Sequence, residues 1–238
     1  MNLRHVILIG AVLGVGAIGI ICWWSANRGD AVGMLSSGSP VERSRAVAKL
    51  RAAADSPEGL ERIAETLRNK DPAVAQSGLQ ALAPTVPDKP LAPEAVKVVE
   101  SAVKDPRPQI QVAAIQILEA STPPAPTDPT VPNIVLKAFL AEKAPETRAA
   151  AADALGKFQH WDAMESLVDA LEDESPDVRN AAGMAVRRIL GLDYGFRAKA
   201  PPADRQAAIA RIRAGWKLQF PFHKDNVRRI REKRSAQP

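Results

Sequence analysis

The apolar and polar positions of the chain follow two different patterns. Residues 6–24, VILIGAVLGVGAIGIICWW, form an apolar run of 19 residues without a charge. After residue 39, apolar residues recur at spacings of three and four, which places them on one face of a helix. Runs of β-branched and aromatic residues are scarce after residue 30, and aromatic residues make up only 4% of the chain. The pattern therefore predicts an all-α domain preceded by one membrane-spanning segment.

The apolar run has the length of a bilayer-spanning helix. As a helix its 19 residues would extend about 28 Å, close to the roughly 30 Å of hydrocarbon in a bilayer. Trp23 and Trp24 stand where interfacial aromatic residues are common, and residues 1–5 form a short positive n-region. We predict a transmembrane signal anchor at residues 6–24. A cleaved signal peptide stays open as an alternative, since Val15-Gly16-Ala17 resembles a cleavage site.

Glycines inside this run allow two further interpretations. Residues 14–19 spell GxGxxG, but a nucleotide-binding fingerprint needs a strand before it and an amphipathic helix after it. Here the glycines lie within one unbroken apolar run, so we assign them to the membrane helix. Gly10 and Gly14 form a GxxxG pair that could support a weak homodimer. The alternative is that glycine is simply frequent in membrane helices.

Residues 25–39 are rich in glycine and serine and predict a flexible linker. A short N-terminus followed by one anchor favours a C-terminal domain outside the cytoplasm. Arg28, Arg43 and Arg45 weaken this positive-inside bias. We expect a single-pass protein of the cell membrane whose domain is extracytoplasmic.

A proline-based frame recurs five times after the linker. It begins at Pro40, Pro72, Pro108, Pro145 and Pro176, with spacings of 32, 36, 37 and 31 residues. Six residues after each proline stands a small residue: Ala46, Gly78, Ala114, Ala151 and Ala182. Ten residues after each proline stands a large apolar one: Leu50, Leu82, Leu118, Leu155 and Val186. A period of this length indicates an array of supersecondary units.

Each unit is predicted to be a helical hairpin. The prolines suit the first turn of a helix, Asp71 and Ser175 can cap two of them, and Gly156 and Gly191 are expected as left-handed C-caps. A second helical pattern follows in four copies, at Leu60, Ile63, Ala64 and Leu67, at Val96, Val99 and Val103, at Ile134, Val135, Ala138 and Phe139, and at Met164, Leu167, Val168 and Leu171. One hairpin cannot bury its apolar face alone, so stacking is expected.

Two segments, ESPDVRNAAGMAVRRILG (174–191) and APETRAAAADALGKF (144–158), make the chain resemble the HEAT-repeat family. The resemblance is strongest to the bacterial HEAT-like repeats first known from phycobilin lyases, and it covers about residues 39–216. It implies a right-handed α-solenoid of about five helical hairpins, which we place at residues 40–220. It also implies that an arginine three residues after the proline ties neighbouring repeats together. Arg43, Arg148 and Arg179 keep this arginine, whereas Ala75 and Gln111 depart from it.

Three segments depart from the repeat pattern. Residues 83–93 and 121–132 are proline-rich connections that favour polyproline II and should project from the same edge, as an interaction surface or as stiff exposed loops. The segment with Tyr194 and Phe196 forms an irregular turn. A helix after Pro202, with Ile209, Ile212 and Trp216 on one side, is expected to cap the solenoid.

The net charge of +5 is concentrated at the C-terminus. From Lys217 onward the chain has seven Lys/Arg and two acids, whereas the remainder has 25 of each sign. Residues 221–238 therefore form a predicted basic tail that could contact anionic lipid or nucleic acid, or could simply be solvated. Its candidate contact residues are Lys224, Arg228, Arg229, Arg231, Lys233 and Arg234.

The sequence offers little for catalysis. A single cysteine, Cys22, excludes an intramolecular disulfide framework, and His5, His160 and His223 lack metal-ligand spacing. We therefore predict no catalytic residue, cofactor or metal site, and no enzyme activity. The expected function is a membrane-anchored HEAT-repeat scaffold that binds a protein of unknown identity. The alternative is binding of nucleic acid or anionic lipid through the basic tail, with nucleic acid disfavoured by the neutral body and the anchor.

Overall fold

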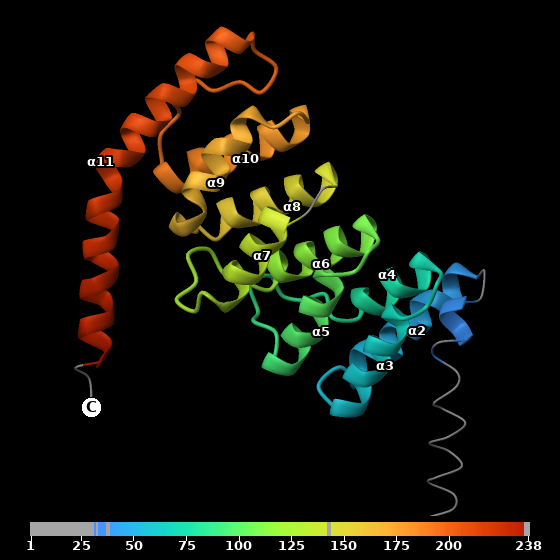
Figure 1. Cartoon of the computed structure of the whole chain (residues 1–238). Helices are drawn as coiled ribbons and strands as arrows, with labels where there is room; N and C mark the ends of the chain where they lie inside the picture. The colour runs from blue at the N-terminus through green and yellow to red at the C-terminus, as the bar shows by residue number, and fades with distance from the viewer. Residues whose placement is uncertain (1–30, 32, 37–38, 142–143, 236–238) are drawn as a thin grey trace, which may run out of the picture. The chain divides into compact units, whose positions relative to one another are not determined.

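A computed structural model describes the protein over residues 31, 33–36, 39–141 and 144–235 (Figure 1). All regular structure in these residues is helical, which confirms the predicted all-α class. The chain divides into two compact units, one up to Leu82 and one from Ala83. The predicted anchor at 6–24, including Gly10 and Gly14, lies outside the described residues. Within the described residues, no helix has both the length and the apolar composition needed to span a bilayer.

The five prolines of the repeat frame each begin a helix, as predicted. These helices are α2 (Pro40–Ala53), α4 (Pro72–Gln80), α6 (Pro108–Ala120), α8 (Pro145–Lys157) and α10 (Pro176–Leu190). Proline suits this position because its missing N–H would have no partner in the first turn. Asp71 caps α4 by accepting the N–H of Ala73 at 2.8 Å. Ser175 occupies the N-cap of α10, but its side chain makes no capping hydrogen bond.

The second helices follow the predicted apolar patterns. They are α3 (Pro57–Leu67), α5 (Pro93–Val103), α7 (Thr130–Ala141) and α9 (Met164–Asp169), the last flanked by the 3-10 turns η1 (Trp161–Ala163) and η2 (Ala170–Glu172). Most predicted positions on them are buried, whereas Ala64, Val96 and Ile134 are half-buried. All ten small and large frame positions are also buried, with Leu82 lying two residues beyond the end of α4.

In the first unit, α2 packs on α3 and α4, and α3 packs on α4. Gly78 allows α4 to approach α3, because a Cβ at this position would lie 1.8 Å from Oγ1 of Thr66. Part of the predicted linker at 25–39 is helical in the structure. Residues 33–36 are helical, and Ala31 and Leu35 are buried. Their spacing of four places both side chains on one helical face.

In the second unit, the first helices stack in the order α6, α8, α10, with α8 in contact with both neighbours (Figure 1). The second helices α5, α7 and α9 pack against α6, α8 and α10 respectively. The boundary between Leu82 and Ala83 separates α4 from α5, which are the two helices of the predicted second copy. A single continuous, right-handed solenoid over residues 40–220 therefore stays a prediction.

The two predicted glycine C-caps have different outcomes. Gly191 ends α10 with φ of 71°, and its N–H donates to the carbonyl of Arg187, so this prediction is confirmed. Gly156 lies inside α8, so its prediction as a cap is wrong. A Cβ on Gly156 would lie 2.5 Å from Cα of Ala185. Glycine is therefore required there by the close approach of α8 and α10.

The two proline-rich insertions do not form uninterrupted polyproline II. Asp88 in the first and Ala125 in the second have positive φ values, of 59° and 49°. The N–H of Asp88 donates to the carbonyl of Ala120 at 2.8 Å, and Nζ of Lys157 donates to its carboxylate at 2.9 Å. The second insertion begins where α6 ends. Both insertions thus meet the carboxyl end of α6, and the first is fastened there.

The final helix, α11 (Pro202–Ser235), starts as predicted, with Ile209 and Ile212 buried. It continues through Pro221 to Ser235, so the predicted boundary between solenoid and tail at 220/221 is not the end of an element. The helical spacing of apolar residues extends past residue 216, which explains this continuity. Side chains of α11 are described as far as His223.

We expect Gly156→Ala to lower the free energy of unfolding, by up to about 2 kcal/mol. Overpacking costs about 1–3 kcal/mol and outweighs the roughly 1 kcal/mol by which alanine favours a helix. Gly33→Ala is the matched control, because Gly33 is helical and has nothing within 4 Å of the added Cβ. Urea unfolding of the full chain, followed by circular dichroism, measures both. A Gly156→Ala chain as stable as the wild type would contradict the close contact.

Candidate functional site

Arg148 links α8 to the segment that precedes α10. Its Nε and Nη2 donate to the two carboxylate oxygens of Asp173 at 3.0 and 2.9 Å. The two side chains are only 15% and 14% exposed. The carboxylate of Asp173, opposed by partial burial, raises the pKa of Arg148. This bidentate geometry is the strong form of a charge-assisted hydrogen bond.

Arg179 joins the segments on either side of α10. Its Nη1 donates to the carbonyls of Asp173 and Glu174 at 2.7 and 3.0 Å, and its Nε donates to the carbonyl of Ala198 at 3.0 Å. Arg43 differs from these two arginines. It is half-buried in α2, and its side chain makes no polar contact with the residues that the structure describes.

Gln111 makes an inter-repeat link at a position where the repeat lacks its arginine. Its Nε2 donates to the carbonyl of Asp105, and its Oε1 accepts from Oγ1 of Thr147, both at 2.8 Å. Gln111 and Thr147 are buried, so this hydrogen bond joins α6 to α8 away from water. Sequence analysis identified Gln111 only as a departure from the family pattern. The signal available in the sequence was a polar amide at a position expected to face a neighbouring helix.

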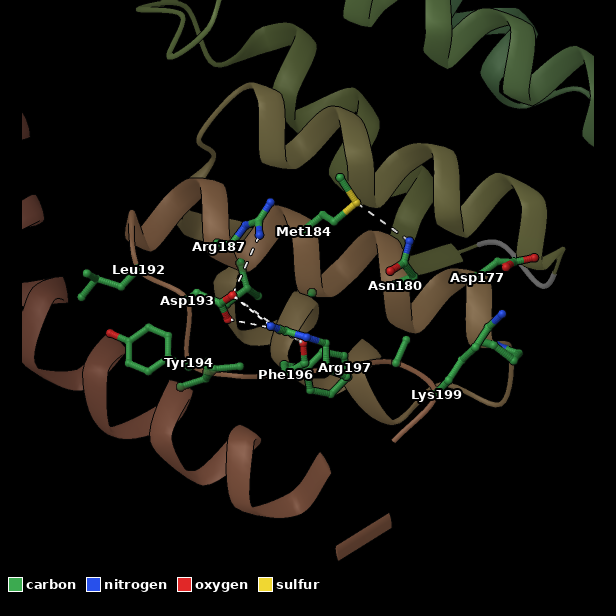
Figure 2. A pocket seen from close by; sticks show the side chains of 15 residues that line it. Asp177, Asn180, Met184, Arg187, Leu192, Asp193, Tyr194, Phe196, Arg197 and Lys199 are labelled. Atoms are coloured by element: carbon green, nitrogen blue, oxygen red, sulfur yellow. Dashed lines mark hydrogen bonds and ion pairs between the residues drawn. The ribbon is translucent and has the colours of Figure 1, made fainter. Parts of the chain in front are cut away.

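A groove of about 670 Å³ runs along the outer face of α10. One wall is α10 itself, with Asp177, Asn180, Met184 and Arg187, and the other is the segment 192–199. This segment runs back along the helix, from Leu192 near Arg187 to Lys199 near Asp177 (Figure 2). We call this site the α10 groove. Sequence analysis predicted an irregular aromatic turn here but not a groove.

The segment 192–199 is held in place at several points. The Phe196 ring occupies the space beside Gly183, where a Cβ would lie 2.8 Å from a ring carbon. Tyr194 packs against α11 at Gly215, where a Cβ would lie 2.0 Å from the phenol oxygen. Nε of Arg211 donates to the Tyr194 carbonyl at 3.1 Å. With the Arg179 bond to Ala198, these contacts preform the groove.

The groove combines exposed apolar side chains with a charged rim. Met184 and Leu192 are 37% and 55% exposed. Asp193 is engaged within the rim, since it accepts the N–H of Gly195 at 2.8 Å and lies 3.4 Å from Arg197. The Gly195 N–H, and after it Arg197, lower the pKa of Asp193.

Three cationic side chains, Arg187, Arg197 and Lys199, line the groove together with two acidic ones. The lining residues include no serine, cysteine or histidine. Within the described part of the chain, no group of three or more His, Cys, Asp or Glu is placed to hold a metal ion.

Two smaller hollows lie at the edge with the proline-rich insertions. Both are lined by Glu119 and Lys157, one together with Pro84 and Pro87 and the other with Pro124. Burial, and then the charge of Asp153, raise the pKa of Glu119, whereas Lys157 and Arg188 oppose this shift. Because Nζ of Lys157 is already bonded to Asp88 and to the Glu119 carbonyl, these hollows offer fewer free groups than the α10 groove.

The six candidate cations of the basic tail, Lys224 to Arg234, lie on the helical backbone of α11. Their side chains are outside what the structure describes, so their role as a contact stays a prediction. His223, which sequence analysis placed at the start of the tail, stacks on Trp161 with ring centroids 4.4 Å apart. Burial lowers the pKa of His223. This stack attaches α11 to η1.

Comparison with known protein families finds a match for part of the chain. The family model described as HEAT repeats matches residues 132–203, from α7 to the start of α11. This stretch is therefore similar to HEAT repeats, in agreement with the resemblance of residues 144–158 and 174–191. No curated protein matches the chain.

Two solved structures are similar to the chain at low identity. The crystal structure of an engineered protein has a TM-score of 0.46 and 19% identity, covering 81% of this chain and 97% of its own. That of an archaeal HEAT-like repeats protein from Thermococcus onnurineus NA1 has a TM-score of 0.46 and 13% identity, covering 79% of this chain and 86% of its own. Both TM-scores are low, so neither structure decides the fold.

We expect Arg148→Met to lower the free energy of unfolding by roughly 2–4 kcal/mol, because it leaves the largely buried Asp173 carboxylate without its cation. Lys104→Met is the control, since Lys104 pairs with Glu100 at the surface and its loss should cost no more than about 0.5 kcal/mol. A double-mutant cycle with Asp173→Asn, followed by urea unfolding of the full chain, isolates the pair. Additive single-mutant effects would contradict the link.

Proposed function

We propose that this protein is a non-catalytic HEAT-like scaffold that binds another protein through the α10 groove and is held at a membrane by residues 6–24. The observation that carries the proposal is a preformed groove with exposed apolar side chains on the outer face of the last repeat. Met184 and Leu192 are exposed there although large apolar side chains are usually buried. Apolar side chains in a preformed hollow are typical anchors of protein binding.

The chemistry of the groove favours one kind of partner segment. The wall of α10 offers Met184, and the opposite wall offers Leu192 and the Phe196 ring. The lining has three cations and two acids, and Asp193 pairs with both Arg187 and Arg197. The exposed Lys199 therefore adds net positive charge to the rim. We therefore propose a partner segment with an apolar side chain flanked by acidic residues. Complementary charge at the rim raises specificity and association rate.

The remaining parts of the proposal rest on sequence patterns. No catalytic motif occurs in the chain, and repeats of this kind commonly present extended binding surfaces. The length and lack of charge of residues 6–24 support a single-pass anchor, and we place the repeat domain outside the cytoplasm as part of the proposal. The partner would then be another protein at the same membrane face.

Site-specific photo-crosslinking in native membranes tests the groove. A photoreactive amino acid in place of Leu192 should give a discrete protein adduct, because this side chain is exposed at the groove. The same amino acid in place of Leu140, which is 63% exposed on α7, is the matched control. Met184→Glu should reduce the Leu192 adduct at least tenfold, because it places a charge at the apolar contact and repels an acidic partner.

Leu140→Glu should leave the Leu192 adduct unchanged. Identical adducts from positions 192 and 140 would contradict a specific groove contact. An adduct at position 192 that survives Met184→Glu would show that the partner does not enter the groove. Circular dichroism of each variant confirms that folding is intact, which is expected since both substituted side chains are already exposed.

A further inference from the structure

One face of α11 is used for packing within the protein. Ile209 and Ile212 are buried, and the Trp216 and Phe220 rings meet edge to face at 6.0 Å. One turn further, His223 stacks on Trp161. Spacings of three and four place these residues on the same side of the helix. This packed face accounts for the attachment of α11 to η1 and its neighbours.

The opposite face carries an apolar pair that is largely exposed to solvent. Leu218 and Phe222 are each 73% exposed, and their spacing of four places them side by side on the helix. Pro221 lies between them and is exposed as well. Single exposed apolar side chains are common on protein surfaces, but an adjacent leucine and phenylalanine on one helical turn form a patch.

This patch coincides with the basic part of the chain. Seven Lys/Arg and two acids lie from Lys217 onward, and the backbone is helical to Ser235. Clustered cations beside exposed aromatic and aliphatic side chains are typical of helices that lie at the surface of an anionic membrane. Phosphate contacts alone would explain the cations but not the exposure of the aliphatic Leu218. A nucleic-acid site built for base stacking would need more aromatic residues along the helix.

We propose that residues 217–235 of α11 lie on an anionic lipid surface, with Leu218 and Phe222 in the interface and the cations against the lipid phosphates. The contact is separate from the α10 groove. It adds a second point of attachment to the membrane at which residues 6–24 are proposed to hold the chain. This segment includes Pro221, and α11 changes direction along its length (Figure 1).

An environment-sensitive label at residue 222 tests the proposal in the full chain. Cys22→Ser removes the native thiol, and Phe222→Cys accepts an NBD fluorophore. The protein is reconstituted in vesicles of phosphatidylcholine with or without phosphatidylglycerol. We expect a blue shift and a several-fold rise in emission only with phosphatidylglycerol, reversed by high salt because the attraction is electrostatic. Label on Leu140→Cys is the control and should not respond.

A second variant separates the roles of charge and apolar contact. Arg228→Gln with Arg229→Gln and Arg231→Gln should remove most of the response to phosphatidylglycerol, while Leu218→Ser should reduce the blue shift in the same vesicles. Equal emission at residue 222 with and without phosphatidylglycerol would overturn the proposal. So would an equal response at residue 140, or a stronger response to duplex DNA than to the anionic vesicles.

Each of the two proposed contacts can be disrupted without affecting the other. Met184→Glu should abolish the crosslink from position 192 and leave the response of the label at 222 unchanged. Leu218→Ser should reduce the response of the label at 222 and leave the crosslink from position 192 unchanged. A loss of both signals in either variant would contradict the separation of the groove from the lipid contact.

Discussion

The close approach of successive first helices is the constraint on which the second unit depends. A helical hairpin leaves one apolar face uncovered, so α8 can be buried only if α6 and α10 come near on both sides. Small residues at Ala114, Ala151 and Ala182 are fully buried on these helices, and Gly156 lacks even a methyl group where α8 meets Ala185. Interiors are close-packed, so one added carbon at such a contact must displace backbone.

A chain of polar contacts fixes the register of this stack and extends to the groove. Gln111 and Thr147 join α6 to α8, and the Arg148 pair with Asp173 ties α8 to the segment before α10. Arg179 donates to backbone carbonyls on both sides of α10. The same arginine that orders the last repeat therefore also holds the far wall of the groove. Repeat packing and the shape of the candidate site are coupled through these bonds.

Periodic features of the sequence were sufficient to predict the repeat helices. Proline is well suited to the first turn of a helix, so the starts of α2, α4, α6, α8 and α10 follow from local chemistry. Gly191 is likewise a local C-cap. Gly156 was wrongly predicted as a C-cap, and the link made by Gln111 was not predicted. Both roles depend on a neighbouring helix that is distant in sequence.

The groove and the outer face of α11 could not be predicted either, because both depend on contacts between segments that are distant in sequence. In the sequence, Tyr194 and Phe196 indicated only an irregular turn. The fold places this segment, together with Leu192, alongside α10. The tail boundary at 220/221 was placed by charge, but α11 continues through Pro221, with the Trp216–Phe220 and Trp161–His223 ring contacts on either side of it. Asp88 similarly turns the first insertion back onto α6 and α8 by long-range bonds. The polyproline II propensity of the insertion did not indicate these long-range bonds.

Hydrogen–deuterium exchange of the full chain measures most directly whether α8 is the centre of the second unit. Amides open with a free energy that reflects how much packing must be lost. The account predicts that the amides of α8 around Ala151 and Leu155 exchange more slowly than those of α5 and of α11, which have neighbours on fewer sides. Exchange in α8 as fast as in α5 would contradict a stack held together through its central helix.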